Sequence, residues 1–211
     1  MKSNILELDG LSVARDGALL MPPLSYRLQS GDLLVIEGAN GSGKSSLLKC
    51  IAGLLPAAAG DIRLNGKHIR DYGSEALLYL GHLRGLSLPM SVEDNVAFWA
   101  QAYGQPELIE AALHYFDLED IADVPVRTLS AGWQQRVALT RLLTVPGVVW
   151  LLDEPLANLD QEGTGLLYSL LQTRMERGGI ILLASHAKVQ GERIKTINIS
   201  EMPFALSEES I

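Results

Sequence analysis

The stretch "DLLVIEGANGSGKSSLLKCIAGLL", residues 32–55, joins an apolar run to a helix-type pattern through a glycine-rich turn. It contains G-x-x-x-x-G-K-[ST] in the context that this pattern requires, with a strand expected before it and a helix after it. The glycines let backbone N–H groups turn toward phosphate oxygens, the start of the helix adds partial positive charge, and Lys44 adds a full one. The stretch therefore predicts a nucleoside triphosphate site, and the flanking elements disfavour the alternative of a glycine turn with an incidental lysine. The residues expected to bind the nucleotide here are Gly38, Ala39, Asn40, Gly41, Ser42, Gly43, Lys44, Ser45 and Ser46.

Carboxylates and a histidine follow two later apolar runs. Asp153 and Glu154 end "GVVWLLDE", and His186 ends "IILLASH". The carboxyl ends of parallel strands meet at the edge of an open sheet where ligands bind. We therefore expect Ser45 and Asp153 to hold Mg²⁺, Asp153 through water, and Glu154, His186 and Lys44 to be catalytic. Glu154 would polarise the attacking water and His186 would contact the γ-phosphate. Loop-capping carboxylates and a structural histidine are the alternatives.

The hydropathy pattern along the chain predicts an α/β fold. Buried apolar strands that alternate with helices indicate a parallel sheet covered on both faces. Residues 5–30 alternate in short pieces, and Asn65-Gly66 separates two short runs, so antiparallel strands and a hairpin are expected there. Residues 84–145 have a helical period, with Ser91 as an expected N-cap, Gly104 as a stop and Pro106 opening the next helix. We treat residues 1–211 as one domain with this helical insert.

Composition excludes several classes of function. The chain has 211 residues, 47% of them apolar, and a net charge of −8, which argues against nucleic acid and against an anionic membrane surface as partners. The single cysteine, Cys50, excludes an internal disulfide and makes a cytosolic site the default. No apolar run approaches the roughly 18 to 20 residues of a membrane span, so direct membrane insertion is not expected.

The string "LSAGWQQR", residues 129–136, resembles the signature motif of ATP-binding-cassette ATPases. Residues 158–160, "NLD", look like the D-loop of that family, and His186 looks like its switch histidine. The resemblance implies a RecA-like P-loop NTPase core with an antiparallel β subdomain and a helical subdomain, and ATP with Mg²⁺ as cofactors. It also implies a head-to-tail homodimer in which Ser130 and Gly132 cap the ATP of the partner. A plain N-cap role for Ser130 is compatible with this.

Four positions depart from the pattern of that family. Ala131 and Trp133 replace a glycine and a glutamine of the signature motif. His82 takes the place of the glutamine that approaches the metal, so it is a candidate for contact with Mg²⁺-bound water or for coupling to a partner. Arg15 takes the place of the aromatic that stacks on adenine, and its planar guanidinium can also stack. Trp133 is expected either between the core and the helical insert or at the dimer interface.

At a finer level, "YLGH", "SVEDNVAFWA" and "LSAG" look like the ATP-binding subunit of the haem exporter of bacterial cytochrome c maturation. That resemblance implies integral membrane transporter subunits as partners and a peripheral position on the cytoplasmic face of the inner membrane. The ATPase subunit of another exporter, for a drug or a peptide, is an alternative. A soluble cassette ATPase acting on nucleic acid or ribosomes and a binding-only cassette used as a scaffold are two others.

Overall fold

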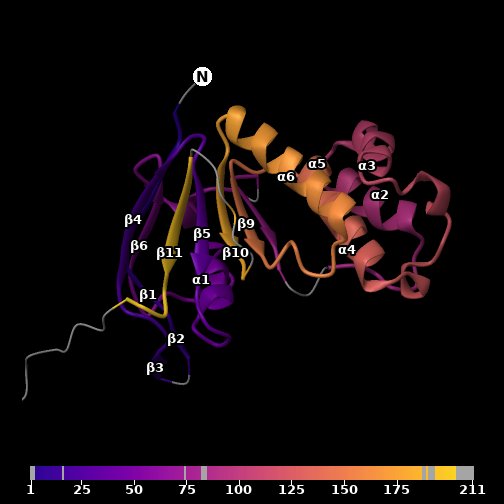
Figure 1. Cartoon of the computed structure of the whole chain (residues 1–211). Helices are drawn as coiled ribbons and strands as arrows, with labels where there is room; N and C mark the ends of the chain where they lie inside the picture. Colours follow the sequence, from indigo (N-terminus) through magenta and orange to yellow (C-terminus); the bar gives the residue numbers. More distant parts are fainter. Residues whose placement is uncertain are drawn as a thin grey trace, which may run out of the picture.

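A five-stranded parallel sheet forms the centre of the molecule, which we describe from a computed structural model (Figure 1). The structure describes residues 3–15, 17–73, 75–81, 85–186, 189 and 193–202. The strand order is β11-β5-β10-β9-β8, and every neighbouring pair is parallel. The strands are β5 (Leu33–Glu37), β8 (Leu77–Leu80), β9 (Val149–Asp153), β10 (Ile180–Ala184) and β11 (Ile194–Asn198). Strands β9 and β10 are buried throughout, as continuous apolar runs predict for a sheet covered on both faces.

An antiparallel sheet packs beside the parallel one, with strand order β4-β1-β6-β7. Its strands are β1 (Ile5–Ser12), β4 (Leu24–Gln29), β6 (Ala59–Leu64) and β7 (Lys67–His68), and the short 3₁₀ helix η1 (Ile69–Asp71) follows. Asn65 and Gly66 join β6 to β7 with φ of 52° and 77°. Two positive φ values are what a two-residue type I′ hairpin requires, so the predicted hairpin is confirmed. Strands β2 (Ala14–Arg15) and β3 (Ala18–Leu19) form a separate hairpin.

Helix α1 (Lys44–Ile51) lies between the two sheets (Figure 1). Its apolar residues Leu47 and Ile51 share one hydrophobic cluster with Leu6 of β1 and with Leu34 and Ile36 of β5. Because this cluster anchors both ends of the loop at residues 38–43, the loop is held between a buried strand and a buried helix.

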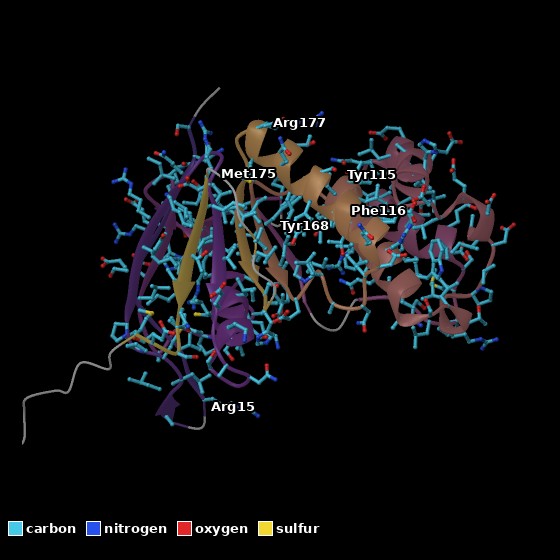
Figure 2. The ribbon with its side chains drawn as sticks, viewed as in Figure 1. Arg15, Tyr115, Phe116, Tyr168, Met175 and Arg177 are labelled. Carbon is cyan, nitrogen blue, oxygen red and sulfur yellow. The ribbon has the colours of Figure 1, made fainter. Side chains whose placement is uncertain are left out.

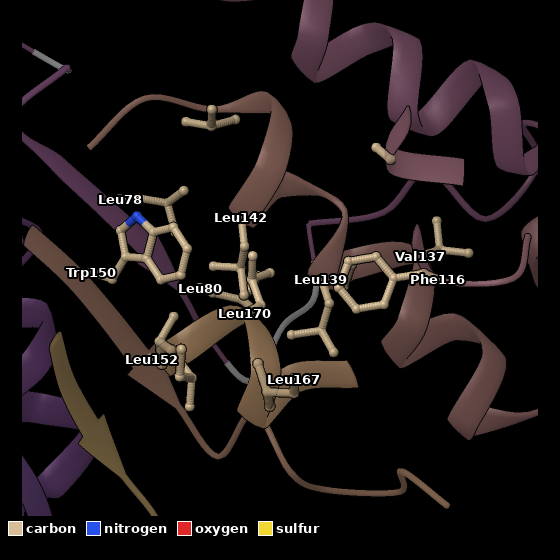
Figure 3. Packing of buried hydrophobic residues seen from close by; sticks show 14 of the residues in the cluster. Leu78, Leu80, Phe116, Val137, Leu139, Leu142, Trp150, Leu152, Leu167 and Leu170 are labelled. Atoms are coloured by element: carbon tan, nitrogen blue, oxygen red, sulfur yellow. The ribbon is translucent and has the colours of Figure 1, made fainter. Parts of the chain in front are cut away.

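Helices cover the other face of the parallel sheet. Figure 3 shows the second hydrophobic cluster running from Trp150 and Leu152 of β9, past Leu170 and Leu167 of α6 (Gln161–Glu176), to Phe116. The cluster is continuous, so the helical segment that contains Phe116 shares a core with the sheet. In the side-chain view, Tyr115 and Phe116 lie near α6, which carries Tyr168 and Met175 (Figure 2).

The helical segment has more breaks than its pattern predicts. It consists of α2 (Val92–Ala102), η2 (Pro106–Leu108), α3 (Ile109–Tyr115), η3 (Glu119–Ile121), η4 (Val126–Thr128), α4 (Ala131–Leu139) and α5 (Arg141–Thr144). The predicted cap at Ser91 is confirmed, because its hydroxyl accepts from the Asp94 N–H at 3.0 Å. The helix expected from residue 131 onward is divided at Thr140, whose hydroxyl donates to the Val137 carbonyl at 2.7 Å. Among the described residues, no helix is long and apolar enough to cross a membrane.

Candidate active site

The loop between β5 and α1 folds around the side chain of Lys44. Its Nζ donates to the carbonyls of Gly38 at 2.7 Å and Ala39 at 3.2 Å, so the cation sits inside the loop with only 6% of its surface exposed. A β-carbon on Gly38 would lie 2.6 Å from the Ser42 hydroxyl. Gly43, at φ 101°, begins α1 without a side-chain cap. No side chain caps the first-turn N–H groups of α1, which makes this helix start, with Lys44 as its first residue, favourable for an anion.

Two oxygen-bearing side chains meet beside this loop. The Ser45 hydroxyl donates to Oδ1 of Asp153 at 2.9 Å, and Asp153 is 4% exposed at the carboxyl end of β9. The Tyr79 hydroxyl, from the neighbouring strand β8, lies 3.4 Å from Oδ2 of the same carboxylate. Burial, and after it the charge of Asp153, raise the pKa of Tyr79, so the phenol stays protonated. A hydroxyl and a carboxylate beside a phosphate site are the oxygen donors that Mg²⁺ prefers, so these residues fit a magnesium ion.

Glu154 and His186 come together at the same edge of the sheet. Oε1 of Glu154 lies 3.4 Å from Nε2 of His186, and Nζ of Lys44 lies 3.4 Å from the same ring nitrogen. Glu154 has a left-handed backbone, with φ of 53°, and its N–H donates to the Ala184 carbonyl at 2.9 Å. Its Oε1 is buried and has no hydrogen-bond partner in the described part of the chain. A left-handed conformation costs energy for a residue with a side chain and occurs often at functional sites.

An open pocket of about 540 Å³ lies over these groups. Arg15 reaches it from the β2–β3 hairpin, which lies next to α1 (Figures 1 and 2). The residues that line it are Arg15, Leu20, Asn40, Gly41, Gly43, Lys44, Ser45, Ser46, Lys49, Glu154, Ala157 and His186. Cations therefore line a pocket in a chain whose net charge is −8. Such a pocket suits a polyanion together with a planar group near Arg15.

Ser130 and Gly132 lie at the start of α4, outside the lining of this pocket. The Ser130 hydroxyl caps the helix by accepting from the Trp133 N–H at 3.4 Å. Gly132 passes so close to the loop after β9 that a β-carbon there would lie 2.7 Å from the Asn158 carbonyl. The indole of Trp133, 37% exposed, packs under the Arg136 guanidinium at 4.8 Å. The start of α4 is thus an exposed polar helix end held against residues 154–158.

A family model described as "ABC transporter" matches residues 21–157, which is well over half of the chain. The chain belongs to the ABC transporter family. Its fold is that of the ABC ATPases: it superposes on an ABC transporter ATP-binding protein from Pyrococcus furiosus with a TM-score of 0.80 at 24% identity, covering 92% of this chain and 97% of the other. A dimeric ATP-binding cassette bound to ADP and Pi superposes with a TM-score of 0.74 at 20% identity, covering 86% and 88%.

Proteins named "Cytochrome c biogenesis ATP-binding export protein" are also similar to this ABC ATPase. CcmA 2 of Cupriavidus metallidurans is 40% identical over 199 residues, which cover 91% of this chain and 94% of that protein. CcmA of Pseudomonas putida is 42% identical over 187 residues, which cover 86% and 89%. The likeness therefore spans nearly the whole of each protein.

Several contacts in this ABC ATPase were not predicted from its sequence. Tyr79 approaches Asp153, Gln135 donates from α4 to the Pro155 carbonyl at 2.9 Å, and the Ser200 hydroxyl accepts the Ala39 N–H at 2.8 Å. All three join segments far apart in the chain, so no local pattern marks them. His82, the expected metal contact, lies outside the described residues.

Proposed function

We propose that this ABC ATPase drives an exporter of cytochrome c biogenesis and that the exported cargo is haem. The observation that supports ATP hydrolysis is at one edge of the sheet. There, Nε2 of His186 lies 3.4 Å from Nζ of Lys44 and 3.4 Å from Oε1 of Glu154. The names of the relatives from Cupriavidus metallidurans and Pseudomonas putida support cytochrome c biogenesis and export. Haem as cargo rests on the finer resemblance of the sequence motifs.

Each residue of the pocket has a distinct proposed role. Backbone N–H groups of residues 38–46 and the Lys44 ammonium bind the phosphates, and Arg15 stacks on the adenine. Ser45 and Asp153 hold Mg²⁺, which neutralises phosphate charge when it is bound. Glu154 accepts a proton from the attacking water through Oε1, which is buried and makes no hydrogen bond in the described part of the chain. His186, beside both Glu154 and Lys44, contacts the terminal phosphate.

The nucleotide site is proposed to be shared between two copies of the chain. Ser130 and Gly132 lie outside the pocket of their own chain, on an exposed helix end that favours an anion. A head-to-tail homodimer would bring this helix end to the terminal phosphate held by the partner. The dimeric cassette to which the chain is structurally similar supports this arrangement.

Integral membrane subunits are the proposed partners, and the cytoplasmic face of the inner membrane is the proposed location. An open pocket of about 510 Å³ lies between the helical segment and the loop after β9, lined in part by Leu86, Leu88 and Gln134. Leu88, Met90 and Phe98 are large apolar side chains that remain exposed on this segment. Exposed apolar side chains of this kind suit a protein partner.

Complementation of a bacterium that lacks its own protein of this type tests the proposed cargo pathway. The wild-type chain should restore covalently bound c-type haem, whereas Glu154→Gln should not, because ATP hydrolysis is lost. Haem of b-type cytochromes, which is not attached covalently, serves as the control and should be equal in both strains. A wild-type amount of covalently bound c-type haem in the strain without the chain, or in the strain with Glu154→Gln, would contradict the proposal. Co-purification of the chain with a drug-type permease as its membrane partner would also contradict the proposal.

A further inference from the structure

Among the described residues, Tyr79 is the one aromatic residue whose side chain hydrogen-bonds to Asp153. It projects from β8, the edge strand that pairs with β9, and its hydroxyl lies 3.4 Å from Oδ2 of Asp153. The other carboxylate oxygen, Oδ1, accepts from Ser45 at 2.9 Å. We propose that Tyr79 is a positioning residue for magnesium, whose hydroxyl holds Asp153 in the orientation that the metal requires. This inference rests on the proposed Mg²⁺-dependent ATPase function.

The need for a second donor follows from the chemistry of a buried carboxylate. The terminal torsion of an aspartate side chain is broad, so one hydrogen bond from Ser45 leaves the plane of the carboxylate poorly fixed. Asp153 is only 4% exposed, and Tyr79 donates the hydrogen bond that the described residues show at Oδ2. Groups that hydrogen-bond a metal-binding carboxylate typically change metal affinity by about 10- to 100-fold when they are removed. Because the Tyr79 contact is long, we expect an effect near the lower end of that range.

Tyr79 is itself held in place from two sides. Arg141 donates from Nη2 to the Tyr79 carbonyl at 3.0 Å, and its guanidinium lies 4.7 Å from the centre of the Trp99 ring on α2. Gly81 lies under the phenol, where a β-carbon would come within 2.7 Å of the ring and of the hydroxyl oxygen. The ring therefore occupies a defined space between the metal-binding edge of β9 and the helical segment. A side chain fixed in this way can orient another group at little additional entropic cost.

Calorimetric titration of a non-hydrolysable ATP analogue into the full-length chain, once with EDTA and once with excess Mg²⁺, tests the inference. The dissociation constant in EDTA divided by the dissociation constant in Mg²⁺ measures what magnesium adds to binding. In Tyr79→Phe this ratio should fall by about tenfold, while the dissociation constant in EDTA stays at the wild-type value. Tyr72→Phe is the matched control, because Tyr72 donates its hydroxyl to the Leu64 carbonyl at 2.7 Å, in the antiparallel sheet region. This control should keep the wild-type ratio.

Gly81→Ala provides a second variant that keeps the Tyr79 hydroxyl but displaces it. Its new β-carbon would lie 2.7 Å from the Tyr79 hydroxyl and ring, so the phenol must leave its present position and the ratio should fall as it does in Tyr79→Phe. In an Asp153→Asn background, Tyr79→Phe should cause little further loss, because the charged acceptor is already gone. An unchanged ratio in both Tyr79→Phe and Gly81→Ala would overturn the inference. A wild-type chain that binds no ATP, or gains nothing from Mg²⁺, would instead overturn the proposed function.

Discussion

Substitution of Gly132 by alanine tests how closely α4 must approach the loop after β9. Gly132 is the second residue of this helix, and an added β-carbon would lie 2.7 Å from the Asn158 carbonyl oxygen. Ordinary contacts begin at 3.4 Å, so the helix start and the loop must separate by about 0.7 Å. Neither atom belongs to a flexible side-chain end, so the shift has to come from the backbone.

The cost of this shift falls on catalysis more than on stability. Alanine gains up to about 1 kcal/mol of helix propensity over glycine, while overpacking costs about 1 to 3 kcal/mol, so stability should fall by no more than about 3 kcal/mol. A misplacement of about 1 Å in a catalytic arrangement can cost roughly a hundredfold in rate, so turnover should fall by about 10- to 100-fold. Binding of ATP to the chain itself should not change, because Gly132 does not line its pocket.

Calorimetry for ATP binding, phosphate release for turnover and urea unfolding for stability measure the three quantities separately. Gly165→Ala is the matched control, because Gly165 lies in α6 and an added β-carbon would meet nothing within 4 Å. It should raise stability by up to about 1 kcal/mol and leave turnover unchanged. Wild-type turnover in Gly132→Ala, or a loss of ATP binding equal to the loss of turnover, would refute the reasoning.

Two further substitutions separate the proposed roles of nearby residues. Ser130→Arg should leave the calorimetric affinity for ATP nearly intact and abolish phosphate release, because the new side chain blocks the partner's site; equal losses would count against a shared site. Asp160→Asn should be less stable than the wild type near neutral pH. The Gly163 N–H and the Arg136 guanidinium lower the pKa of Asp160, so its ionised form stabilises the fold above the unfolded value of about 3.9. Urea unfolding should show this difference vanish as the pH falls through the lowered pKa, and a difference that persists there would contradict the assignment.

The parts of the site that follow from a local sequence motif or from the topology of a parallel sheet could be predicted from the sequence. The loop at residues 38–46 has a local pattern with a direct physical meaning. The meeting of Ser45 with Asp153 followed from the rule that parallel strands end at one edge. The hairpin at Asn65-Gly66 followed from the turn type that these residues favour.

The contacts that could not be predicted depend on tertiary packing. The resemblance marks Gly132 as a nucleotide contact, and only the fold shows that the Asn158 carbonyl also leaves no room for a side chain there. The sequence allows two positions for Trp133, and the structure stacks it on Arg136 with part of the indole exposed. At the break, the Thr140 hydroxyl donates to the Val137 carbonyl, a contact that the helical period does not encode.

The molar mass of Glu154→Gln in the presence of ATP and Mg²⁺ tests most directly the central claim that two chains share each nucleotide. Loss of the proposed base should slow hydrolysis by about 10²- to 10⁴-fold and so preserve bound ATP. Light scattering after size exclusion should then give twice the mass of one chain with ATP, and a single chain once ATP is removed. A single chain at saturating ATP and Mg²⁺, or a variant with full turnover, would contradict the account.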